Sequence, residues 1–176
     1  VIPEPASTAA GHRMMQLVQL FFEADFKISF LTASNNLEFS EKIEIQKIEI
    51  NNESFDEKIR NLNPDLVLFD RYVTEEQFGW RISENCPNTV KIIDTEDLHF
   101  LREARRKAFI EKRNIGKGDL VNEIFVREIA SILRCDLSLI ISEFEYDLLI
   151  NDFKINPNLL FYIPFLTESF EKSETP

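Results

Sequence analysis

Short apolar runs recur along the chain, and segments with helical spacing separate them. Most runs are continuous rather than alternating, as in LVLF and LIIS, which is typical of strands covered on both faces. Residues 43–50 instead alternate between apolar and charged positions and indicate a half-exposed edge strand, with a bulge or break where the alternation slips at Lys47. The remaining predicted strands are residues 26–33, 65–70, 90–94, 137–142 and 160–164.

Capping patterns predict where several helices begin. A Ser or Thr followed three residues later by Glu or Gln can satisfy the free N–H groups of a first helical turn, and this pattern occurs at Ser54, Thr74 and Ser142. A first helix is expected after Gly11. Two more are expected over residues 98–113 and 122–134, with GKGD as the turn between them. The core-facing positions should include Met14, Leu17, Val18, Phe21, Phe55, Ile59, Leu62, Phe144 and Leu148, and most phenylalanines should be buried.

Strands that alternate with helices predict an α/β fold. We expect a Rossmann-like, doubly wound, mainly parallel sheet with helices on both faces. In such sheets ligands bind beyond the carboxyl ends of the strands, so a candidate site should follow directly after a strand.

Composition narrows the function classes. A length of 176 residues fits one domain, although Val1 is not a natural start, and residues 167–176 form a polar tail. The net charge of −11 argues against nucleic-acid binding, which needs a basic surface. No apolar run reaches the roughly 20 residues of a membrane-spanning helix. Cys86 and Cys135 lack CxxC spacing and are expected to be free, partly buried thiols, which favours a cytoplasmic location.

The first candidate site is the stretch PEPASTAAGHRM, where Gly11, His12 and Arg13 open a helix. A helix N-terminus carries free N–H groups and a partial positive charge, so it suits a phosphate or a carboxylate. The G-x-G-x-x-G fingerprint is absent, so no dinucleotide cofactor is expected. The alternative is a loop that only caps the helix.

Two further clusters follow strands. Asp70 and Arg71 come directly after LVLF, and they are either ligand-binding residues or a surface ion pair. Asp94 ends the strand VKIID, and Asp97 and His99 follow it. A carboxylate beside an imidazole can hold its tautomer and raise its pKa, although Asp97 could also be only a helix cap. No further ligands accompany Asp94 and Asp97, so no metal is expected.

The helix after this cluster is basic. Residues 102–113 contain six basic and two acidic residues, a net charge of +4 within a chain of −11. This local excess suits a phosphorylated acceptor or an anionic membrane surface. A solvated helix face, balanced by the acidic remainder of the chain, is the alternative.

Five segments, in this order, resemble the N-terminal lobe of a GT-B-fold glycosyltransferase of the retaining bacterial type. They are PEPASTAAGHRM, NPDLVLFDRY, TEEQFGWR, VKIIDTEDLHFLR and CDLSLIISEFEYDLL, and together they span nearly the whole chain. The resemblance implies a two-lobed enzyme that moves a sugar from a nucleotide-sugar donor to an acceptor in the cleft between the lobes. Residues 1–176 would be the acceptor-binding lobe. A first strand before Val1 and the C-terminal donor-binding lobe are expected but missing, so this lobe alone should be inactive.

The resemblance also implies roles for residues. Gly11 and the turn after it match the loop near the donor phosphates, and His99 lies where such enzymes place a cleft histidine. His99 and Asp97 are therefore the catalytic candidates, through electrostatic stabilisation of the leaving phosphate. The substrate-binding candidates are Gly11, His12, Arg13, Asp70, Arg71, Asp94 and Glu143. No metal or cofactor is expected. The acceptor would be a sugar, a lipid or a protein, with peripheral contact at the inner face of a membrane through residues 102–113.

Two alternatives remain open. The chain could be a non-catalytic Rossmann-like scaffold or interaction domain. It could also be a receiver-like domain phosphorylated at Asp94, but DTED precedes a basic helix rather than the acid pair and lysine that such domains use.

Overall fold

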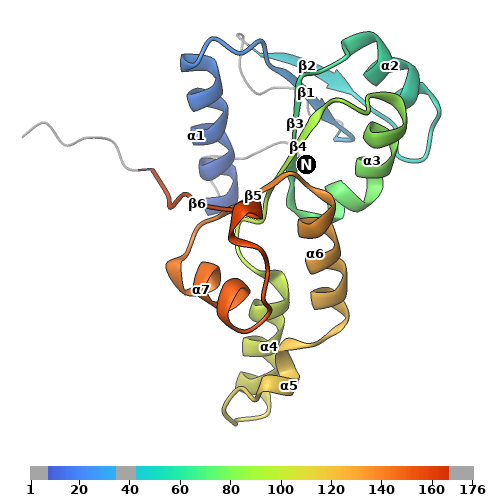
Figure 1. Ribbon diagram of the computed structural model, residues 1–176. Coiled ribbons are helices and arrows are strands. Elements are labelled where there is room, and N and C mark those ends of the chain that lie inside the picture. Colours follow the sequence, from blue (N-terminus) through green and yellow to red (C-terminus); the bar gives the residue numbers. More distant parts are fainter. Residues whose placement is uncertain (1–7, 35–42, 167–176) are drawn as a thin grey trace, which may run out of the picture.

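The computed structural model describes residues 8–34 and 43–166, which form an α/β fold with parallel strands and flanking helices (Figure 1). All six predicted strands are confirmed. They are β1 (Ser29–Thr32), β2 (Glu44–Lys47), β3 (Leu66–Asp70), β4 (Val90–Asp94), β5 (Leu137–Ile140) and β6 (Leu160–Tyr162). Strand β2 ends at Lys47, where the alternation of the sequence slips.

Seven α-helices and one short 3₁₀ helix connect these strands in the described part of the chain. They are α1 (Ala9–Glu23), α2 (Ser54–Leu62), α3 (Arg71–Asn85), α4 (His99–Ile110), α5 (Lys117–Leu120), α6 (Glu123–Arg134), α7 (Glu143–Asn151) and η1 (Pro157–Leu159). Helix α6 begins as expected, because the Asn122 side chain accepts a hydrogen bond from the Phe125 N–H.

The strands form two hydrogen-bonded sheets rather than the single sheet that we expected. Strands β3, β4, β5 and β6 lie in this order, all parallel, and β1 pairs in parallel with β2 in a separate sheet. The two sheets share one core, because Leu31 and Ile48 pack with the α2 and α3 side chains that also cover β3. The strand expected before Val1 and the polar tail lie outside the described residues.

Alternate residues of the larger sheet point to opposite faces, as the two-residue period of a strand requires. One face, with Leu68, Ile92 and Leu139, packs against Leu17 of α1. The other face, with Phe69 and Ile93, packs against α2 and α3. Figure 1 shows α1 on one side of the strands and α2 and α3 on the other. The arrangement is Rossmann-like, with helices on both faces.

A third core region joins α4, α6 and α7 beyond the sheet. Leu98, Phe100, Ile132, Ile140 and Leu149 are all fully buried there. Figure 1 shows α4 and α5 extending away from the strands at one end of the molecule. Helix α4 is buried along one face, at Phe100, Leu101, Ala104 and Ala108, and its C-terminal end lies away from the sheet.

Several expectations about helices are wrong. Helix α1 starts at Ala9 rather than after Gly11, because the Thr8 hydroxyl caps it by accepting from the Gly11 N–H at 3.0 Å. Helix α3 starts at Arg71, so Thr74 lies inside it and its hydroxyl donates to the Asp70 carbonyl at 2.7 Å. The starts predicted at Ser54 and Ser142 are in contrast correct to within one residue, because α2 begins at Ser54 and Ser142 is the N-cap residue of α7, although the Ser142 side chain makes no capping hydrogen bond.

The burial of phenylalanines also differs from expectation. Phe55 and Phe100 are core residues, but Phe144 is 58% exposed and Phe109 is 84% exposed. Phe144 therefore does not share the buried face of Leu148. Helix spacing alone placed it there, but α7 meets the core through Leu148 and Leu149.

Candidate functional site

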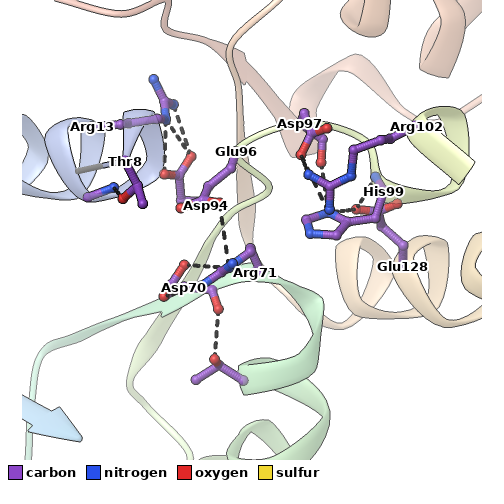
Figure 2. Close-up of polar contacts among 12 residues, drawn as sticks. Thr8, Arg13, Asp70, Arg71, Asp94, Glu96, Asp97, His99, Arg102 and Glu128 are labelled. Atoms are coloured by element: carbon purple, nitrogen blue, oxygen red, sulfur yellow. Dashed lines mark hydrogen bonds and ion pairs between the residues drawn. The ribbon is translucent and has the colours of Figure 1, made fainter. Parts of the chain in front are cut away.

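Strands β3 and β4 end side by side, and the register pairs Asp70 with Asp94. The chain leaves both strands with charged residues, so Asp70 and Arg71 lie beside Asp94 and Glu96 at this edge of the sheet, and His99 lies further along at the start of α4 (Figure 2). We call this group the crest; it consists of Asp70, Arg71, Asp94, Glu96 and His99. Its position beyond the carboxyl ends of parallel strands is the one where α/β sheets bind ligands.

A buried ion pair joins Asp94 of the crest to Arg13 of α1. The Arg13 Nε donates to both carboxylate oxygens at 3.0 Å, and the two side chains are 2% and 0% exposed. The Arg13 Nη1 also donates to the carbonyls of Ile163 (2.9 Å) and Pro164 (3.3 Å). Burial raises the pKa of Asp94, and the Arg13 hydrogen bond opposes this rise. Arg13 and Asp94 thus join α1, β4 and the segment after β6.

Arg71, Asp70 and Glu96 are more accessible to solvent than Arg13 and Asp94. The Arg71 guanidinium forms a bidentate contact with the neighbouring Asp70 carboxylate (2.9 and 3.0 Å), and its Nε lies 3.5 Å from Glu96. Their side chains are 34%, 25% and 12% exposed. Burial raises the pKa of Glu96 to about 7, and the Asp70 charge adds to this rise. Glu96 can therefore exchange a proton near neutral pH.

The backbone is strained where these side chains meet. Arg71 has φ = +66° and Glu96 has φ = +59°, in the left-handed region that non-glycine residues rarely adopt. Such conformations cost roughly 1–2 kcal/mol each and often occur at functional sites. The two strained residues face each other from adjacent strand ends, which makes the crest a functional-site hypothesis on backbone grounds as well.

His99 lies at the start of α4, and its ring is held from one side. Its Nδ1 is 3.0 Å from the Asp97 carbonyl and 3.3 Å from Glu128. A carbonyl can only accept, so Nδ1 carries the proton and Nε2 is the atom that titrates. Burial lowers the pKa of His99, but the hydrogen bond and the charge of Glu128 outweigh it, so the net shift is upward. Tyr72 packs edge-on against the ring.

The predicted partnership of His99 with the Asp97 carboxylate is weak. The Asp97 Oδ1 lies 3.8 Å from the ring nitrogen and instead accepts from Arg102 at 3.0 Å. Glu128 of α6 takes the role that the sequence assigned to Asp97. Nothing near His99 in the sequence indicated Glu128, because 29 positions separate the two residues and only the packing of α6 on α4 brings them together.

Two buried carboxylates cap α4. The Glu128 oxygens accept from the N–H groups of His99 and Phe100 at 3.1 Å, and Glu145 accepts from Leu98 at 3.2 Å. Burial raises the pKa of Glu145, against the effect of this hydrogen bond. Because these donors are taken, the N-terminus of α4 is not available for a phosphate. Asp97 is therefore not the cap of this helix.

The other predicted site residues, Gly11, His12 and Glu143, are not part of the crest. Gly11 is buried within the first turn of α1, where it contributes its N–H to the Thr8 cap. His12 is exposed, and its Nε2 contacts Gln16 at 3.2 Å. Glu143 is exposed at the start of α7, after β5. Glu96 was overlooked, although its place between Asp94 and Asp97 after a strand could have indicated it.

No family model matches the chain, and no curated protein matches it. Within residues 8–34 and 43–166, no group of three or more His, Cys, Asp or Glu side chains is arranged to hold a metal ion. No helix in the described ranges is long and apolar enough to cross a membrane. Any function must therefore be argued from the geometry of the crest.

Proposed function

We propose that this chain is the acceptor-binding lobe of a glycosyltransferase, with the crest as its acceptor site. The observation that carries the proposal is the meeting of Arg71 and Glu96, both in strained backbone, at the ends of adjacent parallel strands. The order of the five segments that resemble a GT-B N-terminal lobe supports it further.

The chemistry of the crest suits a sugar that carries a negative charge. Carboxylates such as Glu96 and Asp97 accept hydrogen bonds from hydroxyl groups. Arg71 and Arg102 contact Asp70 and Asp97, but a guanidinium has five N–H donors, so each keeps donors for a phosphate or carboxylate. The exposed fractions of Asp97 (32%) and Arg102 (60%) leave both within reach of a ligand. Asp70, Arg71, Asp97 and Arg102 would then bind the acceptor.

In this proposal, Glu96 and His99 supply the proton chemistry. Glu96, with a pKa of about 7, can accept a proton from an acceptor hydroxyl. His99 can hold positive charge near a leaving phosphate, because Glu128 stabilises its protonated form. Arg13 and Asp94 act as positioning residues, since they contact each other and are almost completely buried. The donor nucleotide sugar would bind to a second lobe.

We further propose that the chain contacts a membrane. The basic residues of α4 would bring the lobe to the cytoplasmic face of a membrane, where a lipid-linked or other anionic acceptor is found.

Thermal unfolding with a panel of monosaccharide phosphates tests the acceptor site. A ligand at a hundredfold excess over its Kd should stabilise the chain by about 2.7 kcal/mol. Arg71→Ala and Glu96→Gln should remove this shift. Arg60→Ala, which changes an exposed arginine of α2 near the opposite end of the strands, should not. UDP-, GDP- and ADP-sugars should leave this lobe unchanged. No shift with any sugar phosphate would favour the non-catalytic scaffold instead.

A further inference from the structure

The last turn of α4 exposes two large apolar side chains side by side. Phe109 is 84% exposed and Ile110 is 62% exposed, although Ala104 and Ala108 on the opposite face are buried. Ile115 (41%) and Val121 (59%), which follow in the sequence, are exposed as well. Contiguous exposed apolar groups on a surface indicate a site of interaction.

Cationic side chains surround these apolar residues. Residues 102–117 contain seven basic and two acidic residues, and we call residues 105–117 the basic tip. Arg106 forms an ion pair with Glu103. Arg113 forms ion pairs with Glu111 and Asp119. Lys107 and Lys112, in contrast, form no ion pair with any residue in the described ranges. Arg105 lies over the Phe144 ring at 5.6 Å and likewise has no carboxylate partner there.

Helical spacing places the apolar and basic groups together. Arg106 lies three residues before Phe109, and Lys107 lies three residues before Ile110, so these basic and apolar side chains are neighbours on the surface of α4. Figure 1 shows this end of α4, with α5, at one extremity of the molecule. A flat partner can therefore reach the basic tip without meeting the rest of the chain.

We propose that the basic tip docks on an anionic membrane surface. Phe109 and Ile110 would enter the boundary between headgroups and acyl chains, and Arg105, Lys107 and Lys112 would contact the anionic headgroups. The remainder of the chain is strongly acidic, so the same surface repels it and only the tip can approach. The docking surface extends the membrane location proposed above, but vesicle binding needs no sugar transfer, so the two proposals can fail separately.

Charge and apolarity together favour a membrane over the other partners. Nucleic acid would attract the cations, but it offers no apolar phase for Phe109 and Ile110. A symmetric dimer formed through the tips would bring two positively charged surfaces together, and these repel each other.

Co-sedimentation with phosphatidylcholine vesicles, with or without phosphatidylglycerol, tests the docking. The protein should bind the anionic vesicles and be released by salt. Phe109→Ala combined with Ile110→Ala should weaken binding about tenfold or more. Lys107→Glu combined with Lys112→Glu should also weaken it, by about tenfold or more. All four side chains are exposed, so these variants should fold. Val126→Ala combined with Leu133→Ala, at exposed positions of α6, should bind like the parent chain.

Several outcomes would overturn the proposal. These are the absence of binding to anionic vesicles at low salt, equal binding to neutral vesicles, and binding that survives Phe109→Ala with Ile110→Ala. Binding of a control RNA that the same variants abolish would assign the tip to nucleic acid. A dimer seen by light scattering and lost in the Phe109 and Ile110 variant would assign it to self-association. Sugar-phosphate binding at the crest should remain intact in all the tip variants.

Discussion

Glu96 makes the stability of the folded chain depend on pH in an unusual direction. Its folded-state pKa of about 7 lies above the ordinary value of 4.5, because burial disfavours the charged carboxylate. Between these pH values the folded protein holds a proton that the unfolded chain releases. The contribution of Glu96 to stability is therefore present below about pH 4.5 and is lost as the pH rises to about 7.

Glu96→Gln mimics the protonated carboxyl and should remove this loss. We expect the variant to melt a few degrees above the parent chain when the pH exceeds about 7, and close to the parent below about pH 4.5. Melting curves followed by circular dichroism across this range measure both. An equal shift at every pH would mean that the Glu96 carboxylate does not titrate in this range.

The upward pKa shift of His99 depends on Glu128. Glu128→Gln removes the charge that stabilises the imidazolium, so the pKa of His99 should fall. Arg102→Ala serves as a control of opposite sign, because Arg102 lowers this pKa and its removal should raise it. Titration of the imidazole resonances by NMR distinguishes the two. A His99 pKa that does not respond to Glu128→Gln would contradict the contact that holds the ring.

The Arg13–Asp94 pair should matter most when only one partner is removed. Arg13→Met leaves a buried, unpaired carboxylate, which costs about 3–5 kcal/mol. The double variant with Asp94→Leu removes both charges and should recover most of that loss. Urea unfolding at neutral pH measures the difference. A double variant as unstable as Arg13→Met would indicate that the lost contacts to Ile163 and Pro164, rather than the charge, dominate.

At the scale of the elements, α3 and α6 meet around a buried carboxylate. Glu75 of α3 is 1% exposed and pairs with Arg134 of α6, and its side chain folds over Gly79. A methyl group at position 79 would overlap the Glu75 carboxylate, because the Glu75 Cδ would lie only 2.9 Å from the methyl carbon. The carboxylate cannot move without weakening its contact with Arg134.

Gly79→Ala should therefore destabilise the protein, although the same change inside an exposed helix stabilises it by about 1 kcal/mol. We expect a loss of about 1–3 kcal/mol in urea unfolding. Gly118→Ala provides the comparison, because a methyl group at position 118 would meet no atom within 4 Å. Equal changes in the free energy of unfolding for the two variants would show that the Glu75 side chain can move aside at little cost.

The elements themselves were largely predictable, because strands and helices follow from local periodicity. All six strands and the limits of α6 agree with the pattern of apolar residues and the Asn122 cap. The start of α3 could not be predicted from the capping pattern at Thr74. The helix begins three residues earlier, at Arg71, whose backbone adopts a left-handed conformation directly after the strand. Local sequence does not encode such strain.

The site was predictable in position but not in its contacts. Asp70, Asp94 and His99 follow strands, and parallel pairing alone brings the ends of β3 and β4 together. The pairing of Arg13 with Asp94, 81 positions apart, depends on how α1 lies across the sheet. Glu128 and Glu145 reach α4 only through helix packing. The pattern of apolar and polar residues does not predict such contacts between side chains and elements that are distant in the sequence.

At the scale of the whole molecule, the two cysteines behave as core residues. Both are free and buried, and burial raises the pKa of Cys135 to about 12. A thiol reagent should therefore react with neither in the native protein and with both in denaturant. Absorbance on reaction with a chromogenic disulfide measures this. Rapid labelling of the native protein would mean that the core around α3 and α6 opens readily.

The crest and the basic tip would together orient the lobe on a membrane. Helix α4 connects them, since His99 stands at its first residue and Phe109 and Ile110 at its last. A helix of 12 residues places the two ends roughly 18 Å apart. An acceptor with an anionic headgroup and a lipid anchor could thus contact the crest while the tip touches the bilayer.

The most direct measurement is a map of sugar-phosphate binding by NMR chemical shifts of the backbone amides. Titration with the monosaccharide phosphate that stabilises the chain most should first shift the amides of residues 70–72 and 94–99. Arg71→Ala should abolish those shifts. Perturbations that gather at the opposite end of the strands, around Arg60 and Asn85, or that are absent altogether, would contradict an acceptor site at the crest.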